Sequence, residues 1–85
     1  MNAVIYTANQ REEDFLYDQL SRAGRKRRQL DRMESVRGSP EYYLAAREYD
    51  QAIEAARAHL HNLTLRRYRI SALIVEMMKR EGILP

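Results

Sequence analysis

The stretch GSPEYYLAAREYDQAIEAA, residues 38–56, carries the clearest folding signals in the chain. Gly38 is suited to end one helix. Ser39 can cap the next helix, with Pro40 at its first position and Glu41 in its first turn. This order of residues predicts a tight turn at residues 38–39 between two helices.

The residues after the turn predict one long helix over residues 40–81. Apolar side chains recur in alternating steps of four and three, which is the spacing of a coiled-coil seam. Arg67 and Glu81 are the exceptions in a stripe made of Tyr42, Ala46, Tyr49, Ile53, Ala56, Leu60, Leu63, Arg67, Ile70, Ile74, Met77 and Glu81. A register role for Arg67 is the favoured interpretation. Gly82 is placed to stop the helix.

Two alternatives to this long helix remain open. Thr64 could cap a separate segment after a break near residues 62–64, and YRISALIV has the alternation of a strand. The unbroken seam favours the single helix over both.

The residues before the turn predict a first helix over residues 9–37. Thr7 and Asn9 are candidate caps, and carboxylates fill the turn that follows. Gly24 weakens the middle of this helix, by roughly 1 kcal/mol relative to alanine, and Arg27 interrupts its apolar positions. We expect the helix to continue through both residues.

The expected fold class is all-α, a single domain forming an antiparallel two-helix hairpin that resembles a coiled coil, with a dimer left open. In the register set by a turn at 38–39, Leu16 faces Leu63 and Ala23 faces Ala56. Helix two then extends beyond helix one, and its unopposed apolar residues are each worth about 1.5–3 kcal/mol when buried. We therefore expect partner contacts at Ile70, Leu73, Ile74, Met77 and Met78.

A cluster of cations on the first helix is a candidate face for an anion or an acidic partner. Acidic residues interleave with it, so a solvated, salt-bridged face is the favoured interpretation and nucleic-acid binding a less favoured one. The residues of this face are Arg22, Arg25, Lys26, Arg28 and Arg32.

Composition and motifs argue against catalysis, metal binding and a cofactor. The chain has 85 residues and no cysteine, and His59 and His61 lie two apart, on different sides of a helix. No nucleophile–base pair or phosphate-binding loop is present. No signal peptide or membrane span is predicted, so we expect a cytoplasmic protein that is not an enzyme.

Residues 16–75 resemble the small helical-hairpin co-chaperones of type III secretion needle subunits (the YscE/SsaE/EscE-like family). The resemblance rests on Ser39-Pro40, on Tyr43 three residues after the proline, and on Ala52-Ile53-Glu54. Arg67-Tyr68 and Ser71-Ala72-Leu73 are similar to the end of some members.

The resemblance implies a cytoplasmic virulence co-chaperone. Such a protein binds a helical-repeat chaperone, and together they keep a needle subunit soluble before export. Two alternatives remain open: a small nucleic-acid-associated or phage-type regulatory hairpin acting through Arg22–Arg32, and a self-assembling helical dimer or bundle.

Overall fold

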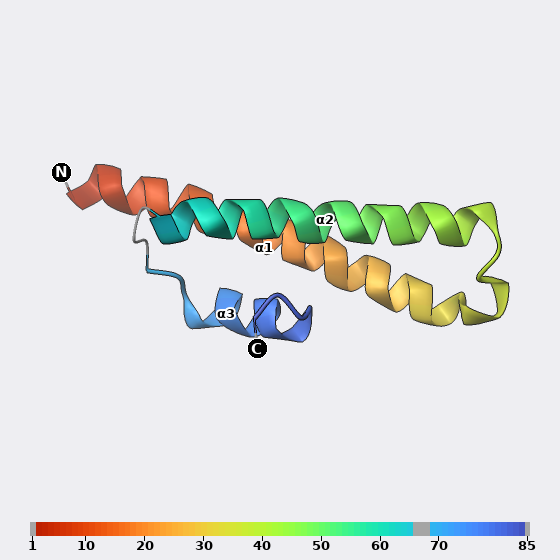
Figure 1. The fold of residues 1–85 in the computed structure, drawn as a ribbon. Coiled ribbons are helices and arrows are strands. Elements are labelled where there is room, and N and C mark those ends of the chain that lie inside the picture. The colour runs from red at the N-terminus through yellow and green to blue at the C-terminus, as the bar shows by residue number, and fades with distance from the viewer. Residues whose placement is uncertain (1, 66–68, 85) are drawn as a thin grey trace.

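The computed structural model describes the backbone of residues 2–65 and 69–84 and the side-chain surroundings of residues 10–63 and 69–84. The described chain contains three α-helices and no strand, which confirms the all-α class (Figure 1). They are α1 (Asn2–Arg32), α2 (Pro40–Leu65) and α3 (Ala72–Arg80), with a 3-10 turn, η1 (Glu34–Val36), between α1 and α2.

Helix α1 differs from the expected helix at both ends. It begins at Asn2, so Thr7 and Asn9 lie inside the helix and do not cap it, and it continues through Gly24 as expected. At its other end the amide of Met33 donates to the carbonyls of Gln29 and Leu30. This shared bond tightens the backbone into η1, so the α-helix ends five residues before the expected residue 37.

The start of α2 is the one that the sequence predicts. The side chain of Ser39 accepts a hydrogen bond from the amide of Tyr42 at 3.1 Å, and Pro40 is the first helical residue. Gly38 does not have the positive φ of a helix-ending glycine. The cap on α2, rather than a glycine stop on α1, therefore defines this turn.

The single helix predicted over residues 40–81 is wrong. Helix α2 ends at Leu65, residues 69–71 are not helical, and α3 begins at Ala72. Arg67, the expected register residue, lies outside the described residues. The physical reason for the separate helix is Ser71, whose hydroxyl accepts from the amide of Ile74 while its own amide donates to the Glu13 carboxylate at 2.7 Å.

Helix α3 ends at Arg80, and Gly82, just beyond it, is the stop that the sequence predicts. This glycine has a φ of 77°, in the left-handed region of backbone conformation. Glycine adopts this conformation at little energetic cost because it has no Cβ. The amide of Gly82 donates to the carbonyl of Lys79 at 3.1 Å, and that of Ile83 to Met78 at 2.9 Å. These two bonds form a Schellman motif.

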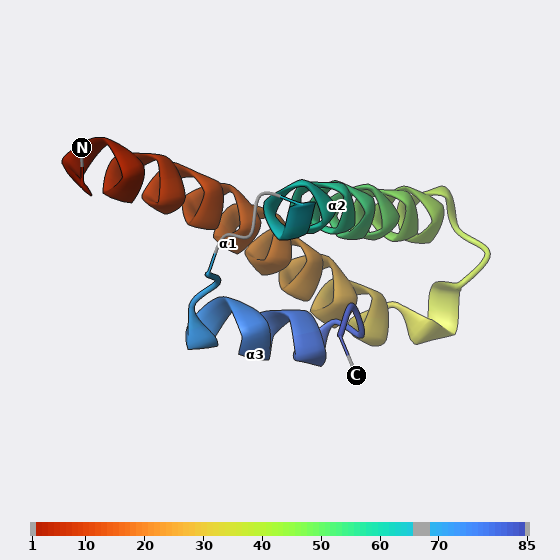
Figure 2. The ribbon, with the colours of Figure 1, turned by 60° about the vertical axis from the view of Figure 1, so that its left-hand side comes forward.

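The two long helices pack against each other, and α3 lies beside α1 in both views (Figures 1 and 2). The molecule is elongated, with extents of 53 × 22 × 18 Å. The larger buried cluster draws on all three helices and consists of Leu16, Leu20, Ala56, Leu63, Ile74 and Met78. A smaller one consists of Ala23, Ala52 and Ile53.

The contact between α1 and α2 has a different register from the expected one. A turn at 38–39 places Lys26 opposite Ile53, but Lys26 contacts Glu48 at 3.0 Å, more than one helical turn away. The early end of α1 causes this shift, because residues 33–39 form the connection. Ala45 and Ala52 are consequently buried, although neither belongs to the predicted stripe, while Tyr42 and Tyr49 are only half-buried.

Candidate protein-binding groove

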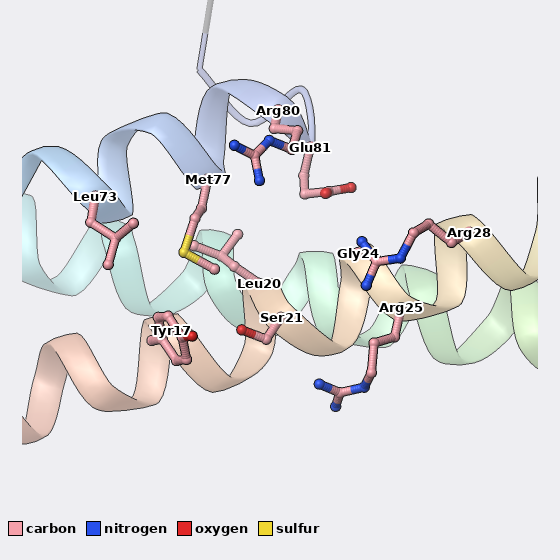
Figure 3. A pocket seen from close by; sticks show the side chains of 10 residues that line it. All are labelled: Tyr17, Leu20, Ser21, Gly24, Arg25, Arg28, Leu73, Met77, Arg80 and Glu81. Carbon is pink, nitrogen blue, oxygen red and sulfur yellow. The ribbon is translucent and has the colours of Figure 1, made fainter.

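A groove of about 400 Å³ runs between α1 and α3 (Figure 3). Helix α1 supplies one wall, and α3 together with Glu81, the residue that follows it, supplies the other. The lining residues are Tyr17, Leu20, Ser21, Gly24, Arg25, Arg28, Leu73, Met77, Arg80 and Glu81.

Helical spacing brings these residues to one place. On α1 the lining residues recur every three or four positions from Tyr17 to Arg28, and on α3 they do so from Leu73 to Glu81. Residues at such spacing share one face of a helix. Gly24 lines the groove without a side chain, and a Cβ at this position would make ordinary van der Waals contact with an Arg28 nitrogen at 3.4 Å and a Glu81 oxygen at 3.5 Å.

An ion pair between Arg27 and Glu81 joins α1 to the end of α3. The Arg27 Nε and one terminal nitrogen donate to the two Glu81 oxygens at 3.0 and 3.2 Å, which is a bidentate arrangement. The Glu81 side chain is only 3% exposed, whereas that of Arg27 is 36% exposed. The hydrogen bonds with Glu81 raise the pKa of Arg27 above its ordinary value.

Tyr49, on α2, interacts electrostatically with the same Glu81 carboxylate. Burial, followed by the negative charge of Glu81, raises the pKa of Tyr49 above the ordinary tyrosine value. The buried Glu81 carboxylate is therefore balanced by Arg27 and lies near a tyrosine that remains neutral.

One end of the groove is apolar. Leu73 is 60% exposed and Tyr17 is 46% exposed. Met77 is half-buried and packs against the larger core cluster. Figure 3 shows Tyr17, Leu73 and Met77 at this end, away from Arg25 and Arg28, whereas Arg80 lies closer to Met77.

The other end of the groove is cationic. Arg25, Arg28 and Arg80 are exposed, and none of the three has an ion-pair or hydrogen-bond partner within the described part of the chain. Each retains the full donor set of a guanidinium group.

The predicted cationic face of α1 is divided by the fold. Arg22 and Lys26 both contact Glu48 on α2, at 3.5 and 3.0 Å, and the hydrogen bond from Lys26 is the main cause that lowers the pKa of Glu48. Arg25 and Arg28 instead line the groove, while Arg32 is exposed at the end of α1.

The five expected partner-contact residues also have different surroundings. Ile74 and Met78 are 2% and 1% exposed in the larger core cluster, and Ile70 packs partly buried against it. Leu73 and Met77 line the groove. Partner contact stays a prediction for all five, and in this conformation only Leu73 and Met77 reach the groove.

His59 has a packing role within the fold. Its ring lies 4.5 Å from that of Phe15, and it forms an ion pair with Glu12 when protonated. Within residues 2–65 and 69–84, no cluster of three or more histidine or acidic side chains has the arrangement of a metal site. The helices in these same ranges are all too short or too polar to cross a bilayer.

Sequence reasoning did not assign Tyr17, Arg80 or Glu81 to a site. The spacing of Tyr17, Ser21, Gly24 and Arg28 along one helical face was the available signal. The predicted single helix over residues 40–81 does not allow that face to pair with residues 73–81. No family model, curated protein or solved structure matches the chain.

Proposed function

We propose that the chain is a non-enzymatic protein-binding module that acts as a cytoplasmic co-chaperone. In this role it binds a helical-repeat chaperone and helps to keep a type III secretion needle subunit soluble before export. The observation that carries the binding function is the exposed apolar end of the groove, at Tyr17, Leu73 and Met77. The resemblance at Ser39-Pro40 and Ala52-Ile53-Glu54 supports the narrower co-chaperone role.

The mechanism is burial of apolar surface between helices. A partner side chain that fills the space beside Leu73 gains about 1.5–3 kcal/mol from full burial. Helical subunits that polymerise through apolar stripes are held apart while such a stripe is covered by another helix. The antiparallel hairpin formed by α1 and α2 provides the rigid support for α3 in this proposal.

Leu73→Asp tests the function in the native cytoplasm. Tagged protein is captured after nuclease treatment and washed at low and high salt, and bound proteins are identified by mass spectrometry. We expect a helical-repeat protein and a small needle-like subunit that persist at high salt and are lost with Leu73→Asp. Leu73 is exposed, so its replacement spares the core, whereas a charge at the 2% exposed Ile74 would disrupt it.

Leu44→Asp is the matched control, because Leu44 is 57% exposed on α2, away from the groove. It should retain the partners. Loss with Leu44→Asp alone would place the binding surface on α2 instead of in the groove.

The alternative that has a structural observation in its favour is nucleic-acid binding, since Arg25, Arg28 and Arg80 lack partners among the described residues. It predicts captured nucleic acid that is released as salt rises. Capture of the protein's own chain alone, with a concentration-dependent mass, would support a self-assembling dimer or bundle.

A further inference from the structure

The two ends of the α1/α3 groove differ in chemistry and lie a defined distance apart. Leu73 and Arg80 are seven residues apart on α3, or about 10 Å at 1.5 Å per residue. On α1, the separation from Tyr17 to Arg25 is eight residues, or about 12 Å. The two walls therefore present the same order, apolar and then cationic, over about two helical turns.

The cationic end carries uncompensated positive charge. Among the described residues that line the groove, Glu81 is the one carboxylate, and Arg27 already binds both of its oxygens. Arg25, Arg28 and Arg80 remain without a counterion within residues 2–65 and 69–84. An occupant that brings carboxylates to this end gains charge-assisted hydrogen bonds.

We propose that the groove binds an acidic amphipathic helix of a protein partner, with large apolar side chains about two turns before a pair of carboxylates on the same face. This inference rests on the proposed protein-binding function and specifies the chemistry of the partner. Leu73 and Met77 form the aliphatic wall for the apolar side chains, and Arg28 and Arg80 receive the carboxylates. A helix that lies along α1 and α3 satisfies both ends at once.

A pair of synthetic helical peptides tests this chemistry directly. The probe is an alanine-rich peptide with two leucines in one turn and two glutamates on the same face two turns later. Its control has glutamine in place of both glutamates. NMR titration of the isotope-labelled full chain should shift the signals of Leu73, Met77 and the groove arginines. We expect the glutamate peptide to bind roughly tenfold more tightly than the glutamine peptide, with the difference reduced from about 50 to about 300 mM salt.

Matched charge variants separate a groove effect from a net-charge effect. Arg28→Gln/Arg80→Gln should abolish the preference for the glutamate peptide. Arg47→Gln/Arg57→Gln changes net charge equally at exposed positions on α2 and should preserve it. Absence of groove shifts at millimolar peptide, or equal affinity for both peptides, would overturn the inference. A mixed-sequence single-stranded oligonucleotide that binds through the same arginines, while the peptide does not, would also overturn it.

Failure of this inference is distinguishable from failure of the proposed function. Partners that are lost with Leu73→Asp but retained by Arg28→Gln/Arg80→Gln would leave protein binding intact and refute the acidic specificity. Groove binding of the glutamate peptide, with no chaperone or needle subunit captured from cytoplasm, would support the specificity and refute the co-chaperone role.

Discussion

At the scale of single residues, a few local signals define where helices begin and end. Ser39 and Ser71 each accept a hydrogen bond from an amide three residues later, and Gly82 ends α3 in a left-handed conformation. Two of these three positions, Ser39 and Gly82, were predictable because their function depends on neighbouring residues alone. The cap at Ser71 is equally local, but the apolar spacing that continues across it favours an unbroken helix, and the bond from its amide to Glu13 depends on tertiary structure.

The two glycines at helix ends should respond differently to alanine. Gly82→Ala should destabilise the fold by about 1 kcal/mol, because an L-residue is strained at a φ of 77°. Gly38→Ala is the control, since this glycine has no positive φ and a Cβ there meets no atom within 4 Å. Urea unfolding followed by circular dichroism measures both, and equal effects would contradict this account of the α3 C-terminus.

At the scale of elements, the docking of α3 is the feature that the sequence pattern concealed. Ile74 and Met77 continue the apolar stripe of α2 in spacing, yet they belong to a separate helix packed beside α1. Folding back buries Ile74 and Met78 against α1 and α2, whereas a continuous helix would leave them beyond the hairpin. Local spacing cannot distinguish these outcomes, because both place the same side chains on one helical face.

Truncation on the two faces of α3 should affect stability to very different degrees. Met78→Ala should lower the free energy of unfolding by about 2–5 kcal/mol, since it leaves a cavity at a side chain that is 1% exposed. Leu73→Ala, on the 60% exposed side, should change it by less than about 0.5 kcal/mol.

Urea denaturation of each variant checks this prediction. If Met78→Ala does not fold, Ile74→Val provides a milder test, with an expected loss of about 0.5–1.5 kcal/mol. Similar losses for Leu73→Ala and Met78→Ala would show that α3 does not pack in this orientation.

At the scale of the whole molecule, Arg27, Tyr49 and Glu81 bring α1, α2 and the end of α3 into one electrostatic cluster. Arg27 interrupts the apolar positions of the first helix in the sequence, and Glu81 ends the predicted stripe of the second. Their mutual pairing explains why both polar residues are accommodated next to the core.

The raised pKa of Tyr49 predicts that the folded state loses stability at high pH. Burial raises its pKa in the folded state above the unfolded value of about 10, so the folded state retains the proton more strongly. The resulting stabilisation is complete below the unfolded pKa and is lost as pH rises through the folded pKa.

Chemical unfolding at about pH 8 and about pH 11 measures this effect. Tyr49→Phe removes the ionisable hydroxyl and should show a smaller decline between the two values than the parent protein. Tyr43→Phe is the control, because Tyr43 is 68% exposed, and it should decline as the parent does. Identical declines for the parent and Tyr49→Phe would contradict the proposed burial effect.

The sequence by itself determined the helical class, the cap at Ser39, the stop at Gly82 and the continuity of α1 through Gly24. These features depend on backbone propensity and on hydrogen bonds within a few residues. Tertiary structure decided the inter-helix register, the end of α2, the burial of Ala45 and Ala52 and the joining of α1 and α3 into a groove. These features depend on which apolar faces exclude water together, and one helical spacing is compatible with several such pairings.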